Sequence, residues 1–116
     1  MKNDIIAIDV SEEYVHHVDR LLERSKLEIF EWFNKPTENC RVKTYIYKDL
    51  SSLRIGLKRR YNKDYPHYMV ACMVDEEENI HRCINIYEPP ITSDESYTRR
   101  EYNQVVFHEL IHYITD

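Results

Sequence analysis

Glycine is almost missing from this chain of 116 residues, in which Gly56 is the only one. A glycine-rich loop that holds phosphates needs several glycines, because only glycine lets the backbone approach the phosphate groups closely. The sequence therefore excludes P-loop and dinucleotide-binding sites. Cysteine is also scarce, and its count of three is odd. An odd count argues against the disulfide framework of a small secreted domain and favours a reducing compartment.

Long apolar runs and a basic surplus are absent as well. The mostly apolar segment 5–10 near the start is too short for a signal-peptide core or a bilayer span. The formal net charge is -5, with charged residues at 32% of the chain. A nucleic-acid-binding domain normally carries a basic excess on one face. We therefore expect a cytoplasmic protein with neither a membrane nor a nucleic-acid partner.

Apolar residues make up 42% of the chain, which is enough for one globular domain over residues 1–116. Ser11 has the character of a helix N-cap. The residues after it that recur at near-helical spacing predict a long amphipathic helix over about 12–34; they are Val15, Val18, Leu22, Ile29 and Phe33.

Further along, alternation predicts a strand over 41–47, and Asp49 or Ser51 can cap a second helix that ends near Tyr61. The apolar runs 68–74 and 80–87 predict an antiparallel hairpin, in which a tight turn would set Cys72 opposite Cys83. A last helix begins near Tyr97. This order predicts an α+β fold with a small, mostly antiparallel sheet.

The last helix carries the pattern H-E-x-x-H at residues 108–112. Residues four apart share a helix face, so His108 and His112 can reach one metal ion. Two neutral imidazoles suit zinc. Glu109 lies about 100° round the helix, outside the metal's first shell but beside a water bound to that metal. There it can act as a general base.

This segment resembles the zincin metallopeptidases. The order of the preceding elements is similar to the N-terminal part of the gluzincin (peptidase MA-like) catalytic domain, and especially to the small minigluzincins. The resemblance implies that His108 and His112 are zinc ligands and that Glu109 is the base. It also implies that the strand over 80–87 is an edge strand that binds an extended peptide substrate, with Asn85 in contact with the substrate backbone.

The sequence departs from that family in its third zinc ligand, because a gluzincin takes this ligand from a helix well downstream and this sequence runs only to residue 116. Four interpretations stay open. The domain is truncated after the active-site helix, or a homo-oligomer or partner completes the site. Alternatively, Asp116 serves as the ligand, or an upstream residue does. The upstream candidates are His67, Cys72, His81 and Cys83.

The sequence thus predicts a zinc metallopeptidase that hydrolyses peptide bonds in a peptide or protein substrate. The alternative is a non-catalytic metal-binding or interaction domain that lacks the third zinc ligand. The sequence gives neither the cleavage specificity nor the oxyanion-stabilising residue, because both depend on the shape of a cleft.

Overall fold

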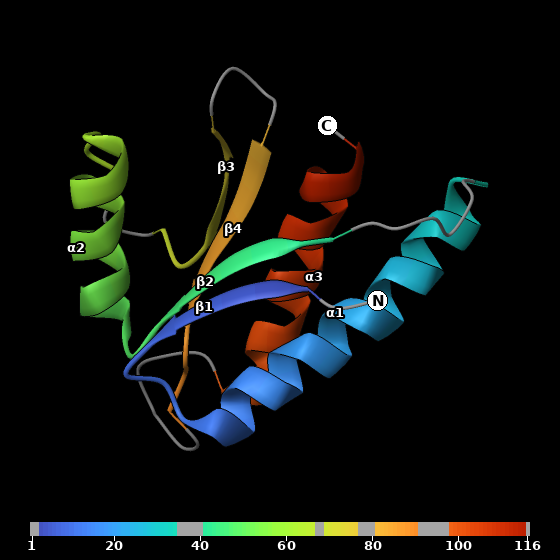
Figure 1. Cartoon of the computed structure of the whole chain (residues 1–116), viewed down its shortest axis with the longest axis horizontal. Helices are drawn as coiled ribbons and strands as arrows, with labels where there is room; N and C mark the ends of the chain where they lie inside the picture. Colours follow the sequence, from blue (N-terminus) through green and yellow to red (C-terminus); the bar gives the residue numbers. More distant parts are fainter. Residues whose placement is uncertain (1–2, 35–40, 67–68, 77–80, 91–97, 116) are drawn as a thin grey trace.

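The computed structural model describes residues 3–34, 41–66, 69–76, 81–90 and 98–115, with the backbone alone at Glu76 and His81. The elements follow the chain in the order β1 (Asp4–Ile8), α1 (Glu12–Trp32), β2 (Lys43–Tyr47), α2 (Leu50–Tyr61), β3 (Cys72–Glu76), β4 (His81–Tyr87) and α3 (Arg99–Thr115). The strands form one sheet in the order β1-β2-β4-β3 (Figure 1). The elements from α1 to α3 lie close to their predicted positions in the sequence, whereas the predicted order did not include the strand β1.

The α+β class is confirmed, but the expected mostly antiparallel sheet is wrong. β1 pairs with β2 in parallel, β2 pairs with β4 in parallel, and only β3 runs antiparallel, along β4. Helix α1 returns the chain to the end of the sheet where β1 begins, so β2 begins at the same end. Helix α2 is the first part of the connection that returns the chain from the end of β2 to the start of β4. Two strands that begin at the same end of a sheet must be parallel. A local alternation of side chains carries no information about that direction.

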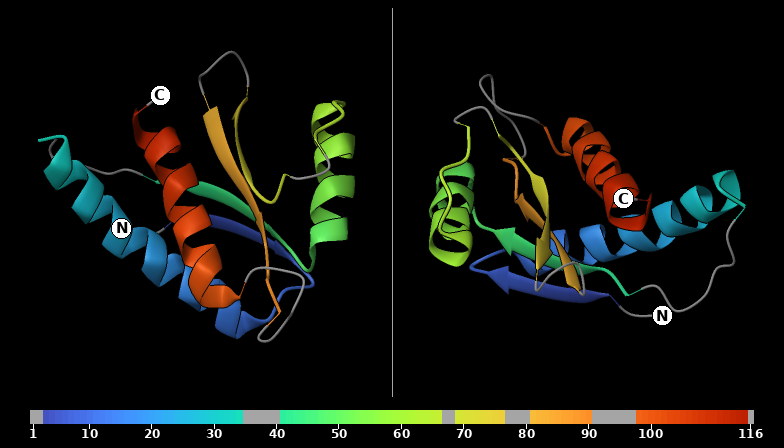
Figure 2. Two further views of the ribbon diagram at one scale, coloured as in Figure 1. Left: turned by 180° about the vertical axis from the view of Figure 1, so that it is seen from behind. Right: turned by 90° about the horizontal axis from the view of Figure 1, so that it is seen from above.

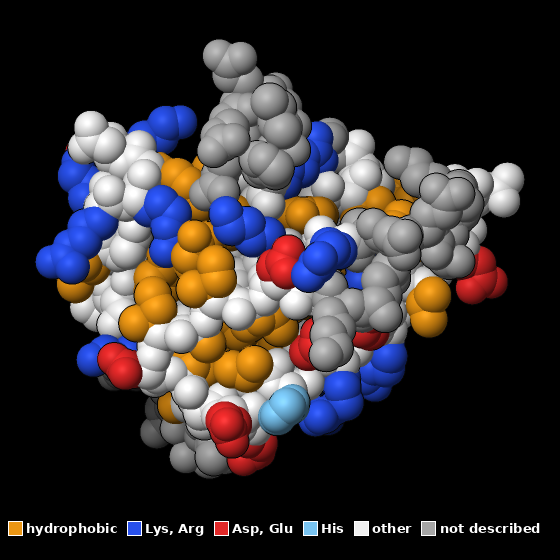
Figure 3. Space-filling view, in the orientation of Figure 1, with side chains coloured by type: hydrophobic (Ala, Val, Ile, Leu, Met, Phe, Trp, Pro, Cys, Tyr) orange, Lys and Arg blue, Asp and Glu red, His pale blue; other side chains and the backbone are white. Residues whose placement is uncertain are grey.

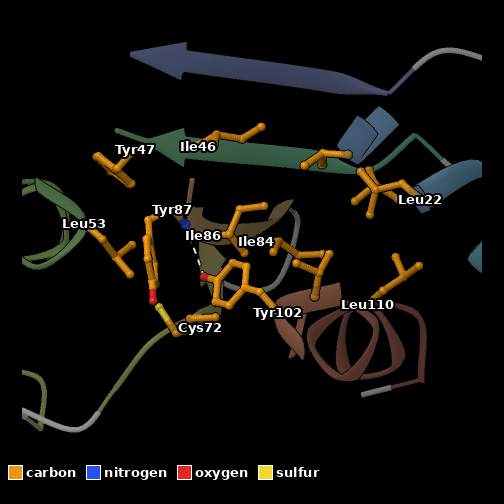
Figure 4. Close-up of a cluster of buried hydrophobic side chains, with 14 of the residues drawn as sticks. Leu22, Ile46, Tyr47, Leu53, Cys72, Ile84, Ile86, Tyr87, Tyr102 and Leu110 are labelled. Atoms are coloured by element: carbon orange, nitrogen blue, oxygen red, sulfur yellow. Dashed lines mark hydrogen bonds between the residues drawn. The ribbon is translucent and has the colours of Figure 1, made fainter. Parts of the chain in front are cut away.

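The helices cover the two faces of the sheet unequally. Figure 2 shows α2 on one face and α1 with α3 on the other. Ile84 and Ile86 point from β4 toward Leu22 of α1 and Leu110 of α3 in the buried core (Figure 4). The opposite face of β2 and β4 meets α2, where the Arg60 guanidinium stacks 3.2 Å from the ring centre of Tyr45.

Helix α1 begins as predicted, because the Ser11 hydroxyl accepts a hydrogen bond from the Tyr14 backbone N–H. Its buried face differs from the prediction at Phe33, which is half exposed and forms the C-cap. The face is completed instead by Lys26, whose ammonium group is buried and donates to Asn3 and Glu23. None of the described helices combines the length and the apolar character that a bilayer crossing requires.

Candidate metal centre

Helix α3 is fixed to the sheet by a stripe of buried residues spaced four apart: Tyr102, Val106 and Leu110. The Tyr102 hydroxyl donates to the Val70 carbonyl over 2.6 Å and accepts the Tyr87 backbone N–H over 3.2 Å. One side chain therefore joins α3 to the end of β4 and to the segment before β3. This contact fixes the position of α3 along the sheet, and therefore the position of its two histidines.

The first turn of α3 is held by an ion pair at the end of β4. Arg99 donates to Glu88 over 2.8 Å, and Glu88 accepts a 2.7 Å hydrogen bond from the Ser11 hydroxyl. Arg99 also reaches Glu13 over 3.3 Å. These contacts connect the starts of α1 and α3, so both helices keep a fixed position relative to β4.

The last turn of α3 is held by β4 and β2. A helix leaves its final carbonyl oxygens without partners inside the helix. Arg82 of β4 donates to two of them, those of His112 over 3.2 Å and Tyr113 over 2.9 Å. The Tyr113 hydroxyl donates to the carbonyl of Arg41 over 3.0 Å. The histidine-bearing turns therefore lie between two anchored ends.

The two histidines converge as the sequence predicts. The Nε2 atoms of His108 and His112 lie 3.0 Å apart, and the ring centres are separated by 4.6 Å. His108 is exposed and His112 is half-buried. Two imidazoles on one tetrahedral zinc, with bonds of about 2.0–2.1 Å, would have their nitrogens about 3.3 Å apart. The separation of the two nitrogens is therefore close to the value that a shared zinc ion requires.

Glu109 follows the first of these histidines and is half-buried. Burial first, and then the negative charge of Glu109, raise the pKa of the Cys72 thiol from 9.0 to about 12. Cys72 begins β3. Helix α3 packs against β3 and β4, and Glu109 is adjacent in sequence to His108 on that helix. A general base for a metal held by the two imidazoles would occupy such a position.

A third ligand is not found among the described side chains. Within that part of the chain, no group of three or more His, Cys, Asp and Glu residues is placed to hold a metal. Cys83 is buried and shares a sheet face with Asn85, which contacts α2 rather than α3. Cys72 is opposite Asn85 in the β3–β4 register and belongs to the same face. The remaining candidates, His67, Asp116 and the side chain of His81, lie outside the described residues.

The expected role of Asn85 does not fit the structure. β4 pairs with β2 on one side and β3 on the other, so the prediction that it is an edge strand is wrong. Asn85 is fully buried; it accepts from Arg60 over 2.9 Å and donates to the Tyr61 hydroxyl over 3.2 Å. An extended peptide cannot reach this side chain. The physical reason is that a parallel β2 and an antiparallel β3 enclose β4.

The register of the hairpin also differs from the prediction. Val74 lies opposite Cys83, and Cys72 lies opposite Asn85. The two thiols are therefore diagonal neighbours rather than a facing pair. Because the shift is two residues, every side chain keeps its predicted face. Only the partners across the hairpin change.

The residues that position the site were not identified from the sequence. Tyr102 could have been found, because it continues the spacing of Val106 and Leu110 along one helix face. Arg82 and Glu88 carry no such signal, since each acts on an element distant in the sequence. Searches against protein-family models, curated proteins and solved structures found no match. The interpretation of the site consequently depends on its geometry.

Proposed function

We propose that this chain is a cytoplasmic zinc metallopeptidase, and the convergence of His108 and His112 beside Glu109 is the observation that supports the proposal. The two imidazoles would hold the zinc ion. Bound zinc supplies Lewis-acid activation of water and of the scissile carbonyl group. A third donor from outside the described side chains, or from a second copy, would complete the set.

Glu109 is the proposed general base. Its carboxylate would accept a proton from the attacking water and pass that proton to the nitrogen of the departing amine. The half-buried position of Glu109 supports this assignment, because a half-buried carboxylate is less hydrated than one on an open helix face. The proton thus moves from water to the amine product through one side chain.

The substrate would be an extended peptide or protein segment. Within the described strands β3 pairs only with β4, so the outer edge of β3 has unpaired backbone groups. An extended peptide can add to such an edge through main-chain hydrogen bonds. Helix α3, which carries Glu109, packs against β3. β3 therefore replaces β4 as the proposed substrate-binding strand.

The substitution Glu109→Gln tests the proposed function. It removes the base while leaving both imidazoles in place. We expect a loss of peptide hydrolysis of about 100-fold or more, with zinc content unchanged. Glu31→Gln, at an exposed position on α1, is the matched control and should keep full activity. Equal activity of the Glu109→Gln variant would contradict the assignment of the base.

The second candidate is a non-catalytic metal-binding or interaction domain. The observation that favours it is that no third donor stands beside the histidines in the described residues. A zinc-loaded chain without activity on a broad mixture of quenched peptides would support this candidate. Hydrolysis that is lost with a chelator and restored by zinc would exclude it.

A further inference from the structure

A cavity lies on the face of the sheet opposite α3. Its volume is about 610 Å³, within the range of small-molecule sites. It is formed where the carboxyl ends of β1 and β2 meet α2, and the carboxyl ends of parallel strands are a common place for ligands. Its lining residues are Ile8, Asp9, Tyr47, Lys48, Ser52, Ile55, Gly56, Arg59 and Arg60.

Tyr47 provides a buried polar group in the wall of this cavity. The side chain is only 4% exposed, and its buried hydroxyl makes no well-formed hydrogen bond to any described residue, although the Arg60 guanidinium lies close enough to interact with it. Burial raises the pKa of Tyr47, although the nearby charge of Arg60 opposes the shift. The hydroxyl therefore stays protonated near neutral pH and can donate. A buried hydroxyl whose hydrogen bonding is incomplete is unfavourable, and a ligand oxygen would supply the missing partner.

The only glycine of the chain shapes the same wall. Gly56 lies inside α2, where glycine is unfavourable compared with alanine. A Cβ atom at this position would fall 2.2 Å from Cε1 and 2.6 Å from the hydroxyl oxygen of Tyr47. The missing side chain makes room for the end of the tyrosine ring against the helix. The hydroxyl thus lies beside Gly56, and both residues line the cavity.

The charges around the cavity are mostly positive. Three lining residues are basic, namely Lys48, Arg59 and Arg60, and only Asp9 is acidic. Arg60 is engaged with Asn85 and Tyr45, whereas Lys48 and Arg59 form no ion pair with any described residue. Over α2 and the neighbouring strands, Figure 3 shows lysine and arginine side chains next to hydrophobic ones.

The apolar part of the lining is exposed. Ile8 is 46% exposed and Ile55 is 51% exposed, and they approach the cavity from β1 and from α2. α2 covers β2 and β4 but leaves these side chains open to solvent. A ligand that covered them would gain the free energy of apolar burial.

We propose that this cavity binds a small molecule with an apolar body and one oxyanion head, a carboxylate or a phosphate. Tyr47, Lys48 and Arg59 receive the head, and Ile8 and Ile55 cover the body. The site is separate from the histidines, because its lining comes from β1, β2 and α2, and the sheet lies between α2 and α3 (Figure 2). Binding here therefore does not depend on the proposed peptidase function.

Titration of the full chain with octanoate and octyl phosphate tests this proposal. We expect a Kd below about 1 mM for at least one of them, with amide shifts in ¹⁵N spectra confined to the lining residues. Octanol, acetate and inorganic phosphate each lack one half of the ligand and should bind at least about 10-fold more weakly. The preferred head identifies the ligand as a carboxylate or a phosphate.

Two pairs of variants locate the binding. Tyr47→Phe removes only the hydroxyl and should weaken binding about 5- to 10-fold, while Tyr45→Phe, outside the lining, should not. Arg59→Gln should weaken binding, while Lys58→Gln on the same helix should not. The Arg59 side chain is at the surface, so that variant remains informative if Tyr47→Phe unfolds. Binding by neither ligand, octanol binding as tight as octanoate, or full affinity in both cavity variants would overturn the proposal.

Discussion

The Nε2 atoms of His108 and His112 lie 3.0 Å apart, one helical turn from each other on a helix held at both ends. We expect the chain to bind one zinc ion through this pair. His108→Ala and His112→Ala should each abolish tight binding, because a single imidazole gives little affinity. His16→Ala, at an exposed position on α1, should bind as the parent does. Competition with a chromophoric chelator measures both affinity and stoichiometry.

The stoichiometry also separates the sources of the third donor. One zinc per chain in a monomer would indicate a donor within the chain. One zinc per two chains, together with a dimer in sedimentation, would indicate a site shared between copies. Unchanged affinity in His108→Ala would contradict the assignment of the ligands.

Tyr102→Phe should destabilise the fold by about 1–3 kcal/mol, the usual effect of leaving buried partners unsatisfied. The Val70 carbonyl and the Tyr87 N–H would both lose their contact. Tyr113→Phe is the comparison, because that hydroxyl also bonds to backbone but lies at a half-buried position. We expect a cost of about 0.5–1.5 kcal/mol there. Urea unfolding measures both changes, and an equal cost at the two positions would contradict the role given to Tyr102.

Gly56→Ala should destabilise the protein, although the same change stabilises an ordinary helix. The new Cβ would fall 2.2 Å from the Tyr47 ring, and the cost of such overpacking is about 1–3 kcal/mol. In a Tyr47→Ala background the clash is gone, so Gly56→Ala should stabilise by up to about 1 kcal/mol. A double-mutant cycle detects this change of sign. Additive effects would mean that the ring moves away freely.

Alkaline pH should destabilise the fold at pH values below those at which the buried tyrosines ionise in the native state. Burial raises the pKa of Tyr14 and Tyr102 above 10.0, and burial first raises that of Cys72 from 9.0 to about 12. The unfolded chain therefore releases these protons at lower pH than the native one. The stability that they contribute is complete below about pH 9 and is lost as the pH rises toward 12.

Urea unfolding at several pH values between 8 and about 11.5 measures this decline. Tyr102→Phe should show a shallower decline, because one of the groups with a raised pKa is removed. A stability independent of pH over this window would contradict the buried environment of these side chains.

The buried thiols should react slowly in the folded chain. Cys72 and Cys83 are buried, and neither forms a disulfide within the described part of the chain. Cys40 lies outside the described residues, so the test uses Cys40→Ser. Thiol titration at pH 8 should give almost no reaction until denaturant is added. Mild oxidation should not form a bridge, because diagonal neighbours across a hairpin have Cα atoms about 7–8 Å apart. Rapid bridge formation would support the directly facing register.

The positions of the elements from α1 to α3 could be predicted because their signals are local. Ser11 caps α1 and Asp49 caps α2, as residues of these types should. The H-E-x-x-H spacing alone brings the two imidazoles together, since the helix itself supplies the geometry. These features depend on residues within one or two turns of each other.

The arrangement of the strands could not be predicted in the same way. Placing β4 in the interior of the sheet requires that β2 and β3 pair with it from distant parts of the chain. Asn85 therefore appeared to be a polar residue on an exposed strand, although two partners from α2 satisfy it in the core. Lys26 is a similar case. The helical pattern of apolar residues would predict a lysine at the surface, but Asn3 and Glu23 stabilise its charge in a buried position.

The parallel pairing of β1, β2 and β4 has a consequence for how the chain folds. Asp4 pairs with Lys43 and Thr44 with Ile84, so each parallel ladder closes a loop of about 40 residues. Such closures are costly in chain entropy and slow folding relative to helices and hairpins. We expect the β3–β4 hairpin and the helices to form first, and β1 to join the sheet late. Until it joins, the edge of β2 has unpaired backbone groups, and association of partly folded chains should occur there.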